Sequence, residues 1–300
     1  MAVRLRRLRM ETARRLRAYR SFATTSDQRG ASQDSNSRPS AIKSNAPRGF
    51  HPPLFAPLLL LFVATLVFRL TNLDLAVSRL FFAEGPVPWP WTDCEPWRTL
   101  YVAGCYPVLG LAALGMLPAL VGGFHQALKR WQKPSLFLGL VLLVGPGLMV
   151  NTLLKPFWGR PRPCQIAEFG GDSPYVAVWS FQPHSDSFSF PCGHASIGFY
   201  LMAPAFLLAR RYPRWAIAFF CLGFGGGGMM GLARIIQGRH FASDVLWSAA
   251  FVYFSGVALY YLMRLHQDAA PITLAQASDA DAVLPLPTAD DTEGKARRAA

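Results

Sequence analysis

Six stretches of almost uninterrupted apolar residues limit what this chain can fold into more than any other feature of its sequence. A helix needs about 20 apolar residues to cross a bilayer. None of the stretches shows the charged stripe of a helix on a soluble protein. The pattern therefore predicts an all-α, polytopic membrane protein with six transmembrane helices, the fourth of them short. The expected spans are about 53–70, 100–124, 135–154, 195–209, 215–235 and 245–264.

The charged residues lie mainly outside these stretches and divide the chain into three parts. Residues 1–51 hold eleven Arg and one Lys against three acidic residues, and only 16% of the whole chain is charged, compared with about a quarter in soluble domains. We expect a basic, disordered cytoplasmic tail at 1–51, a six-helix membrane domain at 52–265 and a disordered, acidic cytoplasmic tail at 266–300. A basic tail of this kind favours contact with anionic lipid head groups over nucleic acid. Its Arg-rich start also resembles a mitochondrial transit peptide.

The distribution of Lys and Arg predicts how the chain is oriented, because cytoplasmic loops carry an excess of both. With the N-terminus inside, 22 of the 30 Lys and Arg residues fall on the cytoplasmic side. Both termini are then cytoplasmic, and the loops 71–98, 155–194 and 236–244 lie on the outer face. The outer cations are concentrated in the last two of these loops, which topology does not explain.

Three short polar segments meet on that outer face. The first runs from Lys155 to Pro163 at the end of the third span, the second from Pro191 to His194 at the start of the fourth, and the third from Arg234 to Asp244. Lys155, Arg162 and Arg234 supply three cations that suit phosphate oxygens. Because phosphoryl transfer depends on stabilising negative charge on those oxygens, the segments indicate phosphate chemistry.

The histidines of these segments are candidates for the chemical steps. His240 and Asp244 are four residues apart, so on a helix they would share a face. The carboxylate could then hold the proton of one ring nitrogen while the other nitrogen attacks phosphorus. His194 could protonate the leaving oxygen as a general acid.

Each of these residues also has an ordinary structural explanation. Lys and Arg at the ends of spans commonly reach the lipid head groups, and a His–Asp pair can merely brace a helix. Zinc or a two-metal centre would need more His or acidic ligands than this face offers. Cys192 with His194 nearby could be a nucleophile, but the His240–Asp244 pair would then have no role.

The three segments also match the pattern of a known family. Lys155–Pro163 fits K-x6-R-P, Pro191–His194 fits P-S-G-H with Cys192 in place of Ser, and the third segment fits S-R-x5-H-x3-D with Ala233 in place of Ser. The chain resembles the type 2 phosphatidic acid phosphatases, a superfamily of lipid phosphatases, over about residues 52–265. The two departures remove hydroxyl groups near the phosphate, and a thiol is the weaker hydrogen-bond donor. We expect reduced or altered activity rather than its loss.

The resemblance implies a role for each matching residue. It implies a phosphohistidine intermediate on His240, orientation of that histidine by Asp244, general acid catalysis by His194, and neither a metal nor another cofactor. The phosphate-binding residues that it implies are Lys155, Arg162, Arg234, Cys192 and Gly193.

Neighbouring residues narrow the expected substrate. Gly145-Pro146-Gly147, Trp158–Pro163 and Phe169-Gly170-Gly171 resemble segments of bacterial lipid A phosphatases. Lipid A is therefore the favoured substrate, with phosphatidylglycerophosphate and undecaprenyl diphosphate as alternatives, in a bacterial inner membrane with a periplasmic site. A phosphotransferase that passes the phosphate to another lipid, and a non-enzymatic transporter, are the competing functions. The loop 155–194, with His184 and Asp186, is the expected source of selectivity.

Some remaining residues carry structural expectations. Cys94, Cys164 and Cys192 fall in outer loops, where the sequence leaves a disulfide open. Gly145-Pro146-Gly147 predicts a kink in the third span, and Gly223 with Gly225–Gly228 predicts close helix packing or a local kink. Three tryptophans of the first outer loop are expected to lie along the lipid surface, namely Trp89, Trp91 and Trp97.

Overall fold

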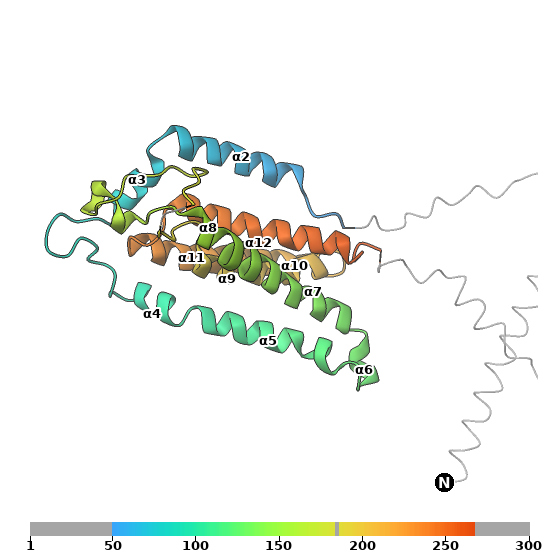
Figure 1. Cartoon of the computed structure of the whole chain (residues 1–300). Coiled ribbons are helices and arrows are strands. Elements are labelled where there is room, and N and C mark those ends of the chain that lie inside the picture. Colours follow the sequence, from blue (N-terminus) through green and yellow to red (C-terminus); the bar gives the residue numbers. More distant parts are fainter. Residues whose placement is uncertain (1–49, 184–185, 268–300) are drawn as a thin grey trace, which may run out of the picture. The chain divides into compact units, whose positions relative to one another are not determined.

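The computed structural model describes residues 50–183 and 186–267, and within them the regular structure is helical, with no β-strand. The predicted tails, apart from residues 50–51 and 266–267, lie outside the described residues, as does His184. Figure 1 shows the long helices α2, α5, α7, α11 and α12 running roughly side by side, with α3 and α4 at one end and α6 at the other.

The first apolar stretch forms α2 (Phe55–Leu70), and α3 (Leu73–Arg79) follows after a bend of 75°. Thr71 ends α2 because its backbone is extended, and its hydroxyl donates to the carbonyl of Val67 at 2.7 Å. The bend directs α3 across the end of the bundle, where it contacts the start of α12.

The second stretch forms α4 (Trp97–Val102) and α5 (Cys105–Val121), which together are long and apolar enough for one span. The short helix α6 (Gln126–Lys129) follows in the predicted cytoplasmic loop. These bounds agree with the predicted span at 100–124 to within a few residues.

The third span contains an irregular helix. It begins as α7 (Gln132–Leu142), widens into the π-helix η1 (Leu143–Leu154) and ends as α8 (Lys155–Trp158). Pro146 cannot donate a backbone hydrogen bond, and the side chain of Asn151 donates to the Pro146 carbonyl at 2.7 Å, five residues away. The disturbance predicted from Gly145-Pro146-Gly147 thus takes the form of a π-helix.

The last three stretches form the centre of the described fold. They are α9 (Gly193–Phe199), with η4 (Tyr200–Met202) and α10 (Ala203–Leu208) continuing it, α11 (Pro213–Ile236), and α12 (Ala242–Leu262). The contact between α11 and α9 is the most extensive between helices of the described residues. A Cβ atom on Gly227 would collide with the Phe199 ring, and one on Gly223 with the backbone of Met202. The predicted close packing is confirmed for Gly223 and Gly227, whereas a Cβ atom on Gly225 or Gly228 would meet no other atom within 4 Å.

Four helices of the described residues are long and apolar enough to cross a membrane, and a fifth span is possible if α2 and α3 count as one. The apolar helix at Gly193–Leu208 is shorter than these. The predicted all-α fold with several apolar spans is therefore confirmed for the described residues, and the sixth span stays a prediction.

The expectation for the first outer loop was wrong for one tryptophan. Trp89 is only 9% exposed and packs with Ile166, Phe169 and Phe241, whereas Trp91 is 51% exposed. Gly238, which has a φ of +63°, brings its backbone against the Trp89 ring, where a Cβ atom would not fit. Trp89 therefore anchors the loop to the end of the bundle.

Candidate active site

The predicted site residues lie at helix ends that meet at one end of the bundle. Lys155 begins α8, Cys192 precedes α9, and Arg234 lies in the last turn of α11. The short link between α11 and α12 carries His240, and Asp244 lies in the first turn of α12. The backbone N–H of Cys192 donates to the Asp244 carbonyl at 3.4 Å, which joins the second segment to the third.

Electrostatic contacts show that the three segments share one site. Lys155 interacts with Arg162, Arg234 and Asp244. His194 interacts in turn with Arg234, His240 and Lys155. Two of the cations predicted to bind phosphate, Lys155 and Arg234, are therefore close to His194, which in turn is close to His240.

Gly193 lies against Asn151 of the third span, and a Cβ atom at this position would collide with the side-chain oxygen of Asn151. The glycine lets the start of α9 approach η1 closely. The backbone N–H groups at this helix start are thereby held beside η1, the helix that Lys155 follows directly.

His240 and Asp244 are paired, although not as two residues on one helix face. Nδ1 of His240 lies 3.5 Å from Oδ2 of Asp244, and both side chains are buried. His240 precedes the helix, while Oδ2 of Asp244 accepts the backbone N–H of Phe241 at 2.8 Å. This capping contact holds the carboxylate beside the imidazole ring.

A buried arginine that the sequence did not single out holds the other side of this carboxylate. Arg160 is fully buried, and its guanidinium contacts Oδ1 of Asp244 at 2.5 Å and Oδ2 of Asp74 at 2.8 Å. It also donates to the Ser243 hydroxyl at 2.8 Å and to the Val176 carbonyl at 2.9 Å. A buried guanidinium requires such complete pairing because its desolvation is costly.

Asp74 extends the network to α3. Its carboxylate accepts the backbone N–H of Ser243 at 3.0 Å and the hydroxyl of Ser243 at 2.6 Å. The hydroxyl of Ser189 donates to Oδ2 of Asp244 at 2.6 Å. Arg160 could have been suspected from its place two residues before Arg162, but Asp74 gives no signal in the sequence.

Tyr101, which the sequence analysis also did not identify, lies against Arg234. The guanidinium carbon of Arg234 lies 4.2 Å from the ring centroid of Tyr101, and its Nη1 donates to the side-chain oxygen of Gln237 at 2.6 Å. The Tyr101 ring also lies 5.2 Å from the His194 ring, between centroids. Helix α4 therefore places an aromatic side chain against both a cation and a histidine of the site.

Two of the cations keep donors that the protein does not use. The Nε atoms of Arg162 and Arg234 are buried and have no hydrogen-bond partner among the described residues. Forked guanidinium donors of this kind match the oxygens of a phosphate group.

Cys192 replaces the family serine and contacts the candidate nucleophile. It is fully buried and lies close enough to His240 for the two side chains to shift each other's pKa. Burial opposes the thiolate, but His240 and Arg234 outweigh that effect and lower the pKa of Cys192. Burial also opposes the imidazolium, yet Cys192 and Asp244 raise the pKa of His240. All five cysteines are among the described residues, and none forms a disulfide.

The described residues contain no group of three or more His, Cys, Asp or Glu side chains placed to hold a metal ion. The positive charge of the site comes from Lys155, Arg162 and Arg234.

Comparison with known proteins gives consistent matches. Residues 135–268 match the family model described as the PAP2 superfamily. A lipid A 4′-phosphatase of Francisella tularensis subsp. novicida (strain U112) is 42% identical over 135 residues, which cover 45% of this chain and 60% of that protein. A lipid A 4′-phosphatase of Rhizobium leguminosarum is 32% identical over 227 residues, which cover 67% of this chain and 93% of that protein. The solved PAP2 type phosphatidylglycerolphosphate phosphatase from Bacillus subtilis aligns with 73% of this chain and 100% of its own, at a TM-score of 0.43 and 19% identity.

Proposed function

The chain belongs to the PAP2 superfamily, and from that premise we propose that it is a membrane phosphatase that removes a phosphate group from lipid A. The family predicted from the three segments is confirmed, and the relatives support the predicted enzyme class. The lipid A 4′-phosphatase names of both relatives favour the 4′-phosphate. The observation that carries the mechanism is the buried His240–Asp244 pair at 3.5 Å, with Asp244 fixed by Arg160.

The first chemical step is attack of His240 on phosphorus. Nδ1 faces Asp244, so the carboxylate holds the proton on that nitrogen and leaves the Nε2 lone pair for the attack. As the N–P bond forms, the P–O bond to the lipid breaks, and His194 gives its proton to the leaving oxygen. The products are a phosphohistidine and the dephosphorylated lipid.

The second step returns the enzyme to its starting state. His194, now neutral, takes a proton from a water molecule whose oxygen attacks phosphorus, and the N–P bond breaks. Free phosphate leaves, and both histidines recover their initial protonation states. If another lipid hydroxyl replaced the water, the same steps would make a phosphotransferase.

The cations of the site supply the electrostatic stabilisation. Lys155, Arg162 and Arg234 face the charge that develops on the phosphate oxygens, and the amide of Gly193 adds a donor at the start of α9. The guanidinium carbon of Arg234 lies over the Tyr101 ring, and its Nε donor has no partner among the described residues. We propose that this charge makes a metal unnecessary.

The same proposal includes a topology. We infer that α9 and α10 complete a sixth, short span, and that the site faces the periplasm from the bacterial inner membrane with both termini in the cytoplasm. The excess of Lys and Arg in the tails and in the loops at α6 and between α10 and α11 supports this orientation. A phosphorylated lipid of the outer leaflet could then reach the cations with its head group.

The test compares the purified full chain with His240→Ala and with His125→Ala, an exposed histidine remote from the site. Phosphate release would be measured with EDTA present, from lipid A, phosphatidylglycerophosphate, undecaprenyl diphosphate and phosphatidic acid. We expect the wild type and His125→Ala to release phosphate from lipid A, and His240→Ala to be slower by roughly 1,000-fold or more.

Three results would contradict the proposal. Release that stops in EDTA would reject metal independence, and full activity of His240→Ala would reject the nucleophile. A phosphorylated acceptor lipid without free phosphate would reassign the chain as a phosphotransferase.

A further inference from the structure

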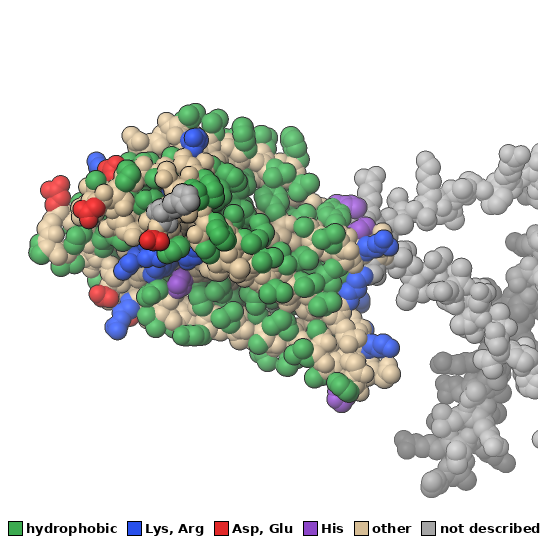
Figure 2. Space-filling view, viewed as in Figure 1, with side chains coloured by type: hydrophobic (Ala, Val, Ile, Leu, Met, Phe, Trp, Pro, Cys, Tyr) green, Lys and Arg blue, Asp and Glu red, His purple; other side chains and the backbone are tan. Residues whose placement is uncertain are grey.

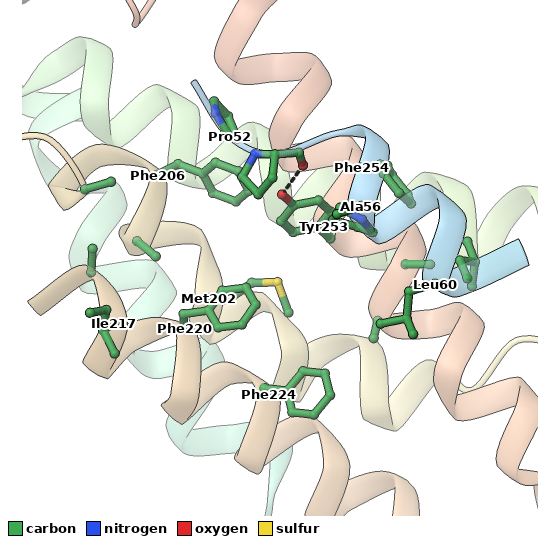
Figure 3. Close-up of a pocket in the computed structure, with 18 of the residues that line it drawn as sticks. Pro52, Ala56, Leu60, Met202, Phe206, Ile217, Phe220, Phe224, Tyr253 and Phe254 are labelled. Carbon is green, nitrogen blue, oxygen red and sulfur yellow. Dashed lines mark hydrogen bonds between the residues drawn. The ribbon is translucent and has the colours of Figure 1, made fainter. Parts of the chain in front are cut away.

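A cavity of about 640 Å³ lies between α2, α10, α11 and α12, away from the candidate active site. Figure 3 shows Leu60, Phe206, Phe220 and Phe224 around it. The part of α11 that lines it runs from Pro213 to Phe224, whereas the site residue of α11 lies in the last turn of that helix. On α11 the cavity and the site therefore occupy opposite halves, while on α12 the lining begins at Leu246, two residues after Asp244, and runs to Phe254.

The walls of the cavity offer no free polar side chain. Every lining residue is apolar except Tyr253, and the Tyr253 hydroxyl donates to the carbonyl of Pro53 at 2.5 Å (Figure 3). Small residues such as Ala216 and Ala249 leave the space between the larger side chains. The part of a ligand that occupies this cavity must therefore be a hydrocarbon chain.

The depth of the cavity matches one leaflet of a bilayer. The stretch of α11 from Pro213 to Phe224 rises by about 16 Å at 1.5 Å per residue. The hydrocarbon core of a bilayer is about 30 Å thick, so one acyl chain extends over about half of it. The cavity thus accommodates a single acyl chain of the leaflet opposite the site.

Three arginines mark the mouth of the cavity. Arg210, Arg211 and Arg214 flank the lining residues Ala209 and Pro213, and no acidic residue occurs between positions 205 and 224. Arg211 and Arg214 are exposed. Positive charge at this depth attracts an anionic head group.

We propose that this cavity binds one acyl chain of an anionic phospholipid of the leaflet opposite the candidate active site, with its head group against Arg210, Arg211 and Arg214. The lipid is a bound structural or regulatory ligand rather than a substrate, because its phosphate lies at the other end of the helices from His240. The inference goes beyond the proposed function and does not depend on it.

The test measures lipid binding to the detergent-purified full chain by native mass spectrometry, with phosphatidylglycerol and phosphatidylcholine as probes. Phosphatidylglycerol has no phosphate monoester for the candidate active site. We expect Ala216→Phe to weaken its binding by roughly tenfold or more, since excluding even two methylene groups has an effect of this size. Ala218→Phe is the matched control, because Ala218 lies on the same helix, is exposed and does not line the cavity.

A second pair of variants tests the head group. Arg211→Gln and Arg214→Gln should each weaken phosphatidylglycerol binding by about fivefold, and neither should affect phosphatidylcholine. Arg130→Gln, in the loop after α6, is the control on the same membrane face. If Ala216→Phe does not fold, Ala250→Phe fills the same cavity from α12.

Several outcomes would overturn the inference. Equal binding of the two lipids would show that the anionic head group is not recognised. Equal losses of binding in Ala216→Phe and Ala218→Phe would show that the lipid does not occupy the cavity. A dimer that Ala216→Phe dissociates would assign the cavity to a second copy of the chain. These readouts involve no phosphatase activity, so they remain informative whether or not the proposed function holds.

Discussion

Charged side chains are buried and paired at one end of the helices and lie beside an apolar cavity at the other. At the candidate active site, Arg160, Asp74 and Asp244 are fully buried and satisfy one another. At the opposite end, the arginines between α10 and α11 lie beside a cavity lined by apolar groups. Figure 2 shows Lys and Arg side chains at both ends, with hydrophobic side chains covering the surface between them.

The contrast agrees with the different ligands that we propose for the two ends. A reacting phosphate requires groups fixed within fractions of an ångström, and buried ion pairs define such positions because any misplacement leaves an unpaired charge. An acyl chain is flexible and needs only apolar volume. Substitutions at the site should therefore act through charge and geometry, and those at the cavity through volume and single hydrogen bonds.

The largest effect is expected from Arg160→Met. Removing the guanidinium leaves Asp74 and Asp244 buried without their shared partner, which should destabilise the protein by about 3–5 kcal/mol. Activity should fall by about 100-fold as His240 loses its orientation. Unfolding in detergent and phosphate release would measure the two effects, with Arg211→Met as the control from the other end. Similar losses of stability and activity in both variants would show that the two ends do not differ in how much they depend on charge.

A smaller effect is expected from Asp74→Asn. Asp74 binds Arg160 and Ser243, which both hold Asp244, and does not itself bind His240, so it is a positioning residue. The substitution should lower kcat by roughly tenfold and leave KM unchanged. Steady-state kinetics would be compared with those of Asp93→Asn, an exposed position in the same loop. A change in KM alone would show that Asp74 acts on substrate binding instead.

The next prediction concerns pH. Cys192 is the largest influence raising the pKa of His240 after the opposing effect of burial. In the proposed mechanism His240 must be neutral to attack, so activity should fall as the pH drops below its pKa. Cys192→Ser removes the sulfur that raises this pKa, so the pKa of His240 should fall and the acid limb of kcat/KM should move to lower pH. Cys164→Ser should leave the limb in place, and a shift to higher pH in Cys192→Ser would contradict the assigned pairing.

The smallest effect is expected at the cavity. Tyr253→Phe removes the hydroxyl that donates to Pro53 and should destabilise the protein by about 1 kcal/mol. Phosphatase activity should not change, because the site lies at the other end. Thermal unfolding in detergent would be compared with that of Tyr212→Phe, an exposed tyrosine. A loss of activity would show that the two ends are coupled.

The apolar spans and the site segments could be predicted because both are local properties of the sequence. A run of apolar residues requires a helix wherever the chain meets lipid, and the residues of each segment lie within eleven positions of one another. The glycines of α11 likewise predicted the close packing found at Gly223 and Gly227, since small residues allow helices to approach closely. The family of the chain followed from these local patterns.

Only the tertiary structure showed which distant residues complete the site. Arg160 and Asp74 are 86 positions apart, and Arg160 and Asp244 are 84 apart. Tyr101 contacts Arg234 from α4, the first helix of another span. Trp89, which was expected at the lipid surface, packs against Gly238 instead. The cavity likewise exists only between four helices. Pairings and cavities of this kind depend on how separate elements pack, whereas helices and motifs depend on neighbours along the chain.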